Sequence, residues 1–349
     1  MKIGLISDIH NNGQYENDIL LKSVENIFKK GAIGLIMAGD IGDYHARRKA
    51  SFEVFKDKVP IEYHKNLVLM LGNHDVRSGG MLDGSLDPDL VNLYREYLKE
   101  FGVGITDNTM CVASSINGYH FLCLNTDVWL KDMMELKQES IDWLKAELVK
   151  RAKPEKPIFI LTHQPLNNSH WRAGLFGGFG KQDAELKKIF ADYPQIVLLN
   201  GHIHNGFGVI EFVQRPFGTL IELPSLTKGE NGVKKPGTGW LLKIESEALI
   251  FEAWNFYEDI HLDEHDKIFE LPLLPVLAKK IENADEDEGI RLSKEANYWM
   301  NLKYANDMPD GDSTTKEPSY YGIKRNYDDS AYREITRLRL EIINYLRSC

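Results

Sequence analysis

The sequence predicts an α/β fold, because short apolar runs alternate with stretches of helical periodicity through its first two hundred residues. The apolar runs are rich in Ile, Leu, Val and Met, are too short for helices and end at Gly, Asp, Asn or His, which is typical of buried strands. We predict strands at residues 2–7, 32–38, 67–71, 119–125, 157–162 and 196–200. In folds that alternate in this way, the carboxyl ends of the strands lie at one edge of the sheet, where ligands bind.

Helices are predicted between these strands. The first, at 15–30, has an apolar stripe formed by Ile19, Val24, Ile27 and Phe28. The others lie at 46–58, 88–101, 138–151 and 183–192.

After residue 205 the pattern changes to short strands separated by turns, without helices between them. These strands are predicted at 207–213, 218–223, 239–245 and 248–254. We expect them to complete a second sheet against the first.

The C-terminal part differs in composition from the rest, because the sequence becomes charge-rich from about Glu258. We therefore divide the chain into a main domain at 1–258 and a mostly helical appendage at 259–349. The last helix is predicted at about 329–347 and has a narrow apolar stripe. Its members are Ile335, Leu338, Ile342 and Tyr345. We expect this stripe to pack against the main domain, with a subunit contact in a homo-oligomer as the alternative.

Composition limits the classes of partner. A net charge of -10 over 349 residues gives no basic field for extended nucleic acid. Three cysteines, one of them at the terminus, form no disulfide framework and favour a reducing compartment. Met1 and Lys2 lead directly into the first strand, and no apolar run has membrane-spanning length. We therefore expect a cytoplasmic protein without a signal peptide or membrane segment.

Polar side chains with oxygen or nitrogen donor atoms follow the predicted strands. They are Asp8, His10, Asp40, Asn73, His163, His202 and His204. Carboxylate, imidazole and neutral carbonyl groups are the ligands that divalent metals prefer, and burying seven of them without a counter-ion would be costly. Alternate residues of an extended strand point the same way, so each of the pairs 8/10 and 202/204 is expected to aim two side chains at one cavity. The pattern predicts a dinuclear metal site, with Asp40 as the bridging carboxylate.

These residues stand in motifs that resemble those of the calcineurin-like metallophosphoesterases. The motifs are Asp8-x-His10, Gly39-Asp40-x-x-Asp43, Gly72-Asn73-His74-Asp75, His163 and Gly201-His202-x-His204. The resemblance covers residues 1–204 and, through the strands that follow, extends to about 256. It implies a four-layer α-β-β-α sandwich of two mixed sheets with flanking helices, and it makes 1–258 the metallophosphoesterase domain. Asp75 stands where many members carry Glu.

The resemblance also implies the role of each residue. Asp8, His10 and His204 would hold one metal, Asn73, His163 and His202 would hold the other, and Asp40 would bridge them. Manganese, iron and zinc all suit this mixed set of ligands. A hydroxide held by the ions would attack phosphorus, His74 would protonate the leaving oxygen, and Asp43 would orient His74.

For the substrate, the segment 161–166 resembles the bacterial branch of cyclic-nucleotide phosphodiesterases, so we expect a phosphodiesterase acting on a small-molecule phosphate ester. The alternatives are a phosphomonoesterase, a protein phosphatase of the same fold and a non-catalytic scaffold. A protein phosphatase would show Asp-Arg-Gly where this chain has Asp43-Tyr44-His45. Four flanking residues are candidate substrate contacts. They are Asn11, His45, Arg77 and, in a glycine-rich aromatic loop, Trp171.

Overall fold

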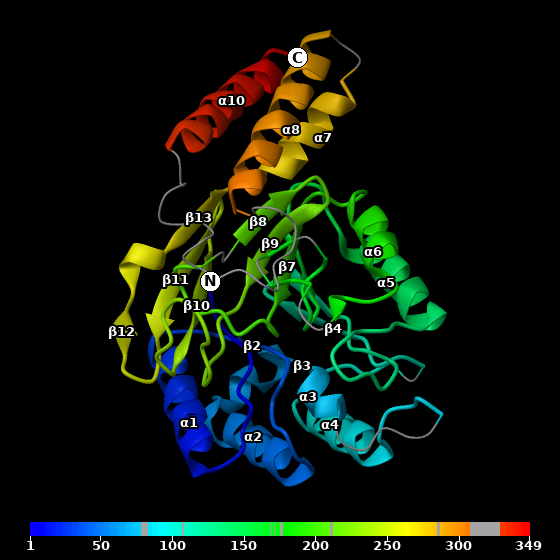
Figure 1. The fold of residues 1–349 in the computed structure, drawn as a ribbon, viewed down its shortest axis with the longest axis vertical. Helices are drawn as coiled ribbons and strands as arrows, with labels where there is room; N and C mark the ends of the chain where they lie inside the picture. Colours follow the sequence, from blue (N-terminus) through cyan, green and yellow to red (C-terminus); the bar gives the residue numbers. More distant parts are fainter. Residues whose placement is uncertain are drawn as a thin grey trace.

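The computed structural model describes residues 1–77, 83–106, 108–167, 169–170, 172–174, 177–209, 212–284, 287–307 and 329–349. Two β-sheets pack together in it, helices flank them, and three helices stand together at one end (Figure 1). None of the described helices combines the length and the apolar composition needed to cross a bilayer.

The first sheet has seven strands, with β1 near its centre. Its strands are β1 (Lys2–Ile6), β2 (Leu35–Ala38), β3 (Leu67–Met70), β10 (Thr238–Ile244), β11 (Ala248–Asn255), β12 (Ile260–His261) and β13 (Lys267–Glu270). The order is β12-β11-β10-β1-β2-β3, and β13 also pairs with β11. Strands β1, β2 and β3 are parallel, with Leu5 beside Ile36 and Ile36 beside Val68. Their carboxyl ends therefore lie at the same edge of the sheet.

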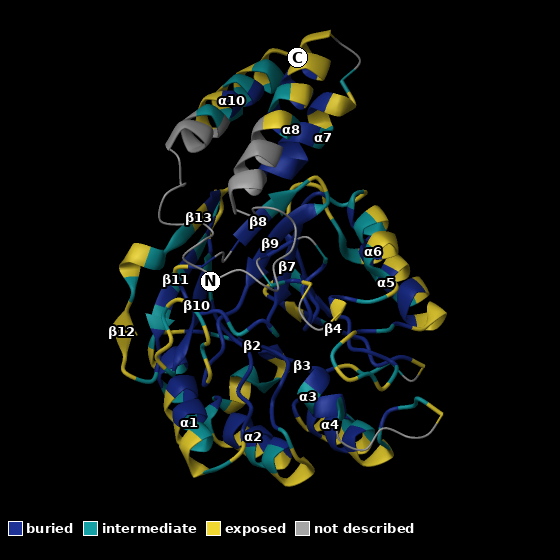
Figure 2. Cartoon of the chain, viewed as in Figure 1, coloured by how far each residue is buried: buried dark blue, intermediate teal, exposed yellow. Residues whose placement is uncertain are grey.

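The second sheet has six strands in the order β4-β5-β6-β7-β9-β8. They are β4 (Val112–Ile116), β5 (Tyr119–Cys123), β6 (Ile158–Leu161), β7 (Ile196–Asn200), β8 (Phe212–Arg215) and β9 (Gly218–Glu222). Strands β5, β6, β7 and β9 are parallel. All residues of β6 and β7 are buried, because helices and the other sheet cover both faces (Figure 2).

The α-helices in the described residues are α1 (Gln14–Lys29), α2 (His45–Lys58), α3 (Asn73–Arg77), α4 (Pro88–Glu100), α5 (Gln138–Arg151), α6 (Asp183–Phe190), α7 (Leu274–Glu282), α8 (Asp287–Asp307) and α10 (Asp329–Ser348). Two short 3₁₀ helices are η1 (Ile61–Asn66) and η3 (Asp263–His265). Helices α1 and α2 lie next to each other, as do α5 and α6 on another side of the molecule (Figure 1). Helix α4 shows how local sequence sets a helix start: Asp87 accepts a hydrogen bond from the amide of Asp89, and Pro88 occupies the first turn.

The predicted architecture of two mixed sheets with flanking helices is confirmed. The assignment of the four late strands to the second sheet is correct for only two of them. Strands β8 and β9 join the second sheet, whereas β10 and β11 join the first sheet beside β1. Strand β8 also begins at Phe212, later than predicted. Strand β4 was not predicted, because its sequence VASSI contains no continuous apolar run.

The C-terminal part begins with strands, because β12 and β13 pair with β11 and extend the first sheet past the boundary predicted at residue 258. Helices α7, α8 and α10 then pack around a hydrophobic cluster of their own. Its buried members are Leu277, Ile281, Leu292, Ala296, Leu338 and Ile342. The stripe of α10 therefore covers α7 and α8, which corrects the expected packing against the main domain. The side chain of Ile335 lies outside the described residues.

Candidate metal centre

The seven predicted ligands meet where strands of the two sheets end. Strand β1 ends at Ile6 and β7 at Asn200, so the pairs 8/10 and 202/204 lie in the loops that follow. Five of the seven have a left-handed backbone: φ is 51° at Asp8, 45° at His10, 57° at Asp40, 75° at His202 and 52° at His204. The predicted alternation along an extended strand is therefore not what aims these side chains. A left-handed conformation costs a non-glycine residue about 1–3 kcal/mol, and such strain is concentrated at functional sites.

Hydrogen bonds join these loops to one another. The amide of Asp8 donates to the carbonyl of Gly39 at 3.0 Å, and the amide of His10 donates to the carbonyl of Asp40 at 2.9 Å. The amide of His202 donates to the carboxylate of Asp8 at 3.1 Å, which links the two sheets. The ligand-bearing loops are thus fixed to one another by the backbone as well as by any bound ion.

Glycine is required directly before three of the ligands, at Gly39, Gly72 and Gly201. A Cβ at Gly39, where φ is +101°, would lie 2.4 Å from Nδ1 of His163. A Cβ at Gly201 would lie 1.9 Å from the Ser7 hydroxyl and 2.4 Å from a carboxylate oxygen of Asp8. The Gly-Asp and Gly-His dipeptides of the motifs therefore allow the loops to approach one another closely.

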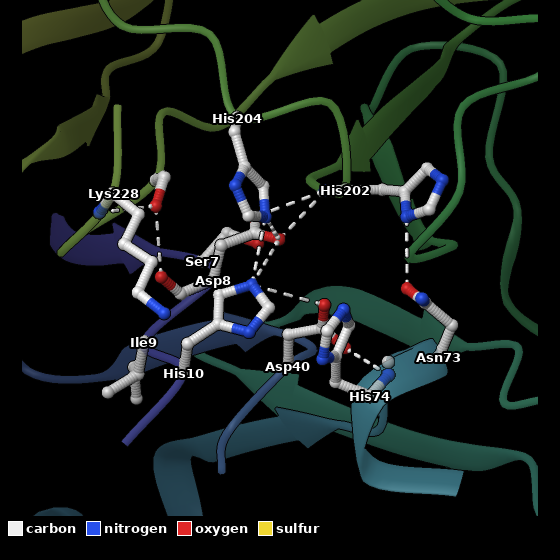
Figure 3. A network of polar contacts seen from close by, with 12 residues as sticks. Ser7, Asp8, Ile9, His10, Asp40, Asn73, His74, His202, His204 and Lys228 are labelled. Carbon is white, nitrogen blue, oxygen red and sulfur yellow. Dashed lines mark hydrogen bonds and ion pairs between the residues drawn. The ribbon is translucent and has the colours of Figure 1, made fainter. Parts of the chain in front are cut away.

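One half of the centre contains Asp8, His10 and His204 (Figure 3). The Nε2 atoms of the two histidines lie 2.8 Å apart, and Nε2 of His204 lies 3.3 Å from Oδ1 of Asp8. Oδ2 of Asp40 lies 3.4 Å from Nε2 of His10. Because metal–nitrogen and metal–oxygen bonds are about 2.0–2.2 Å long, ligand atoms of one ion are separated by about 3 Å, as these atoms are.

The other half contains Asn73, His163 and His202. Oδ1 of Asn73 lies 3.1 Å from Nε2 of His163 and 2.9 Å from Nδ1 of His202. The same Oδ2 atom of Asp40 lies 3.2 Å from Nε2 of His163, so it stands between the two halves. This oxygen is buried and makes no hydrogen bond to the described residues, as expected for an atom that serves two cations.

Two hydrogen bonds and one longer ion-pair contact set the orientation of three of the histidines. Nδ1 of His163 donates to the carbonyl of Ala38 at 2.7 Å. Nδ1 of His10 lies 3.3 Å from Oδ1 of Asp43, and Nδ1 of His204 lies 3.6 Å from Glu230. Each of these rings therefore presents Nε2 to the centre, which is the arrangement found around metal-ligating histidines.

The electrostatics of the centre also fit cations. Burial alone would raise the pKa of Asp8, but the hydrogen bond and charge of His204 lower it to about 2. The pKa of Asp40 is also well below its ordinary value, because attraction to His163 and His10 outweighs burial. Burial would lower the pKa of His163, yet Asp40 and Asp8 raise it to about 9. Burial lowers the pKa of His202 to about 3, which keeps a lone pair for a metal. The donors fit a pair of metal ions.

Next to the centre, Asp43 contacts two histidines with one oxygen. Its Oδ1 lies 3.3 Å from Nδ1 of His10 and 3.2 Å from Nδ1 of His74. The hydrogen bonds to His10 and His74 keep the pKa of Asp43 well below its ordinary value. The backbone amide of His74 donates to Oδ1 of Asp40 at 2.8 Å. His74 is thus held beside the centre, and its free Nε2 is the atom that can exchange a proton with a ligand in the cleft.

Asp75 has a structural position beneath the centre. Its fully buried carboxylate accepts hydrogen bonds from the amides of Ile41, Gly42 and Gly72 at 2.8–3.1 Å. Burial and the nearby charge of Asp40 raise the pKa of Asp75. The carboxylate joins the loop that carries Asp40 and Asp43 to the loop that carries Asn73.

A cleft of about 240 Å³ opens over the centre, and His10, Asp40, Asn73, His74 and His202 are among the residues that line it. Of the predicted substrate contacts, Arg77 lines this cleft and pairs with Asp132. Asn11 and His45 do not line it. The buried amide of Asn11 donates to Asn17 and Ser51, and His45 is exposed at the start of α2, so neither position supports a substrate contact.

Trp171 lies outside the described residues. Phe179 of the same loop is buried in the core and is not free to stack on a substrate.

Four polar lining residues were not predicted. They are Asp132, Arg172, Lys228 and Glu230. Asp132, Lys228 and Glu230 are more than thirty positions from a predicted ligand or lie beyond the last one, so no motif places them near the centre. Arg172 follows Trp171 in the glycine-rich loop, which is the one signal that could have found it.

Comparison with known proteins agrees with this geometry. The family model for calcineurin-like phosphoesterases matches residues 1–206. No curated protein matches the chain. A dimetal phosphatase from Danio rerio has a similar fold, with a TM-score of 0.54 and 13% identity over 75% of this chain and 98% of that one. A purple acid phosphatase from yellow lupin (Lupinus luteus) seeds has a TM-score of 0.52 and 11% identity over 79% of this chain and 55% of that one. The chain belongs to the calcineurin-like phosphoesterase family.

Proposed function

We propose that this chain is a metal-dependent hydrolase of small-molecule phosphate esters and that, within this class, it is a phosphodiesterase. The observation that carries the proposal is the convergence of seven metal-type donors on one centre, with five of them and His74 lining the cleft above it. The donors come from five separate segments of the two sheets, and no packing requirement explains their meeting.

Each residue has a role in the proposal. Asp8, His10 and His204 would hold one ion, Asn73, His163 and His202 would hold the other, and Asp40 would serve both. When bound, such ions neutralise charge on the phosphoryl oxygens and supply hydroxide at neutral pH.

The proton needed by the leaving oxygen comes from Nε2 of His74. Asp43 supports the protonated imidazole, because its ionised carboxylate lies 3.2 Å from Nδ1. General-acid catalysis of this kind contributes about 10²–10⁴-fold to the rate.

The size of the cleft supports a small substrate. About 240 Å³ is slightly less than the smallest usual ligand pocket, which holds roughly 300 Å³. Diester preference rests on the resemblance of the segment 161–166. A cytoplasmic location, the absence of an extended nucleic-acid partner and a homo-oligomer through α10 stay predictions of the sequence.

The test is a substrate panel on manganese-loaded protein, which compares phosphomonoesters, linear phosphodiesters and cyclic nucleotides. The proposal predicts turnover that requires metal and is fastest with a diester. If a monoester were hydrolysed fastest, the diester preference would be wrong, but the assignment as a metal-dependent phosphate-ester hydrolase would stand.

Asp40→Asn is the control variant. Removing the shared carboxylate is expected to reduce bound metal from two equivalents to one or fewer, measured by elemental analysis, and to slow turnover by about 10³-fold, since such ions supply several kcal/mol. A wild-type protein that binds no divalent metal and hydrolyses none of the esters would instead support the scaffold alternative.

A further inference from the structure

Lys228 lies at the margin of the cleft, in the loop after β9, and it lies beyond the residues that the family model matches. Its side chain is exposed and extends toward His10 in Figure 3. It is one of three cationic residues, with Arg77 and Arg172, that line the cleft in the described part of the chain.

The other two cations have carboxylate partners. Arg77 pairs with Asp132, and Arg172 pairs with Glu230 at 2.6 Å. For Lys228, the described residues provide no carboxylate within ion-pair distance. Its positive charge is therefore the one at this margin that an anionic ligand can use without displacing a carboxylate.

Hydrogen bonds hold the backbone of Lys228 beside one ligand loop. The amide of Leu226 donates to the carbonyl of Ser7 at 2.8 Å, and the hydroxyl of Thr227 donates to that of Ile9 at 2.6 Å. The hydroxyl of Ser225 accepts from the amide of Lys228 at 3.0 Å and donates to the carbonyl of Asp8 at 3.0 Å.

On its other side, the same loop is attached to the second pair of ligands, because the amide of Glu230 donates to the carbonyl of His204 at 2.8 Å. Lys228 is therefore placed between the loop of Asp8 and His10 and the loop of His204. A lysine on an unrestrained surface loop would have no such fixed distance from the centre.

We propose that Lys228 selects phosphate esters that carry a second negative charge, in addition to the charge that every phosphate ester carries. This inference rests on the proposed function and specifies its substrate class. An ammonium group is a compact point charge, so its attraction for a ligand grows with the charge of the ligand. The second charge has two chemical sources: the second ionisation of a phosphomonoester, or an acidic group on the second alcohol of a diester.

The experiment compares three substrates with one leaving group. They are 4-nitrophenyl phosphate, methyl 4-nitrophenyl phosphate and the diester in which carboxymethyl replaces methyl. Manganese-loaded wild-type protein, Lys228→Gln and Lys234→Gln are measured at pH 8. Lys234 is a matched control, because it is an exposed lysine of the same loop that does not line the cleft.

Lys228→Gln is expected to lower kcat/KM by about tenfold for the doubly charged esters and by about two- to threefold for the methyl diester, a difference within the range of one charge-assisted hydrogen bond. A loss confined to the monoester or to the carboxymethyl diester identifies the source of the second charge. Equal losses for all three esters, or values equal to those of Lys234→Gln, would overturn the proposal.

Failure of the proposed function can be distinguished from failure of the proposal for Lys228, because in the first case the wild-type protein would hydrolyse none of the esters. In that case, calorimetric titration of the manganese-loaded proteins with inorganic phosphate still tests Lys228. Binding about tenfold weaker in Lys228→Gln than in Lys234→Gln supports anion recognition, and equal binding contradicts it.

Discussion

At the residue scale, one oxygen of Asp43 contacts two histidines to which we assign different roles. Nδ1–H of His10 faces this carboxylate, which leaves Nε2 of His10 for a metal. Nδ1–H of His74 faces it as well, which leaves Nε2 of His74 for a substrate. The rings lie edge to face with their centroids 4.5 Å apart, so a ligand in the cleft can meet both. A single ionised carboxylate thus orients both rings by accepting from Nδ1 of each.

Replacing His74 with Asn tests its role as an acid. A basic alkoxide must be protonated as it leaves, so its diesters are expected to react about 10²–10⁴-fold more slowly. Diesters of 4-nitrophenol release an anion that is stable without a proton, and we expect them to lose less than about tenfold. The measurement is kcat/KM for a series of leaving groups, with metal content determined for each protein. Equal losses across the series would show that His74 has a role other than proton donation.

The residues that meet at the candidate centre could be predicted from the sequence, because each of them follows an apolar run and carries a metal-type donor. The sequence could not show which atom of each side chain faces the centre. The sequence did not show that His202 presents Nδ1 to Asn73 while His163 presents Nε2, since this choice depends on ring rotations and on partners such as the carbonyl of Ala38. The left-handed backbone at Asp8 and His204 was also hidden, because few non-glycine residues adopt it and, although Asp and His are among the more frequent, the local sequence does not show which ones do.

At the element scale, the loops after β2 and β3 are joined through Asp75. The motif showed that Asp stands here where many family members carry Glu. It did not show the three backbone amides that donate to the carboxylate, because these come together only when the two loops approach each other. Parallel strands explain that approach, since β2 and β3 are neighbours with Ala38 beside Met70. The sequence predicted these strands, whereas the division of β8 to β11 between two sheets depends on long-range pairing that no local pattern encodes.

Asp75→Asn is expected to destabilise the protein and to weaken its metal centre. An amide offers one acceptor oxygen where the carboxylate offers two, so at least one buried backbone N–H loses its partner, at a cost of about 1–3 kcal/mol. The loops of Asp40 and Asn73 should then hold metal about 10–100-fold more weakly, as when other outer-shell partners are lost. Urea unfolding and metal titration measure the two effects.

Asp57→Asn, at an exposed position of α2, is the control for this experiment and is expected to stay within about 0.5 kcal/mol of the wild type. If Asp75→Asn matched this control in both measurements, the junction between the two loops would not depend on the carboxylate.

At the scale of the whole molecule, helices α7, α8 and α10 stand at the end opposite α3, the helix that carries Asn73 and His74 (Figure 1). Their apolar cluster is separate from the main core. The sequence predicted α10 and its stripe, but not the partner of that stripe, because an amphipathic helix shows that a face is covered without showing by what. We therefore expect the stability of this three-helix unit to be largely independent of the chemistry of the centre.

Ile342→Ala tests this separation. Ile342 is fully buried among the three helices, and truncation of such a side chain costs about 2–5 kcal/mol. We expect α10 to open at least about thirtyfold more often, which hydrogen exchange or limited proteolysis of its residues would detect, while metal content and kcat/KM stay at wild-type values. Leu340→Ala is the matched control, because Leu340 lies on the same helix and is 58% exposed, so its loss should cost less than about 0.5 kcal/mol. A fall in kcat/KM for Ile342→Ala, with both metals retained and Leu340→Ala unaffected, would show instead that the three-helix unit acts on the centre across the length of the molecule.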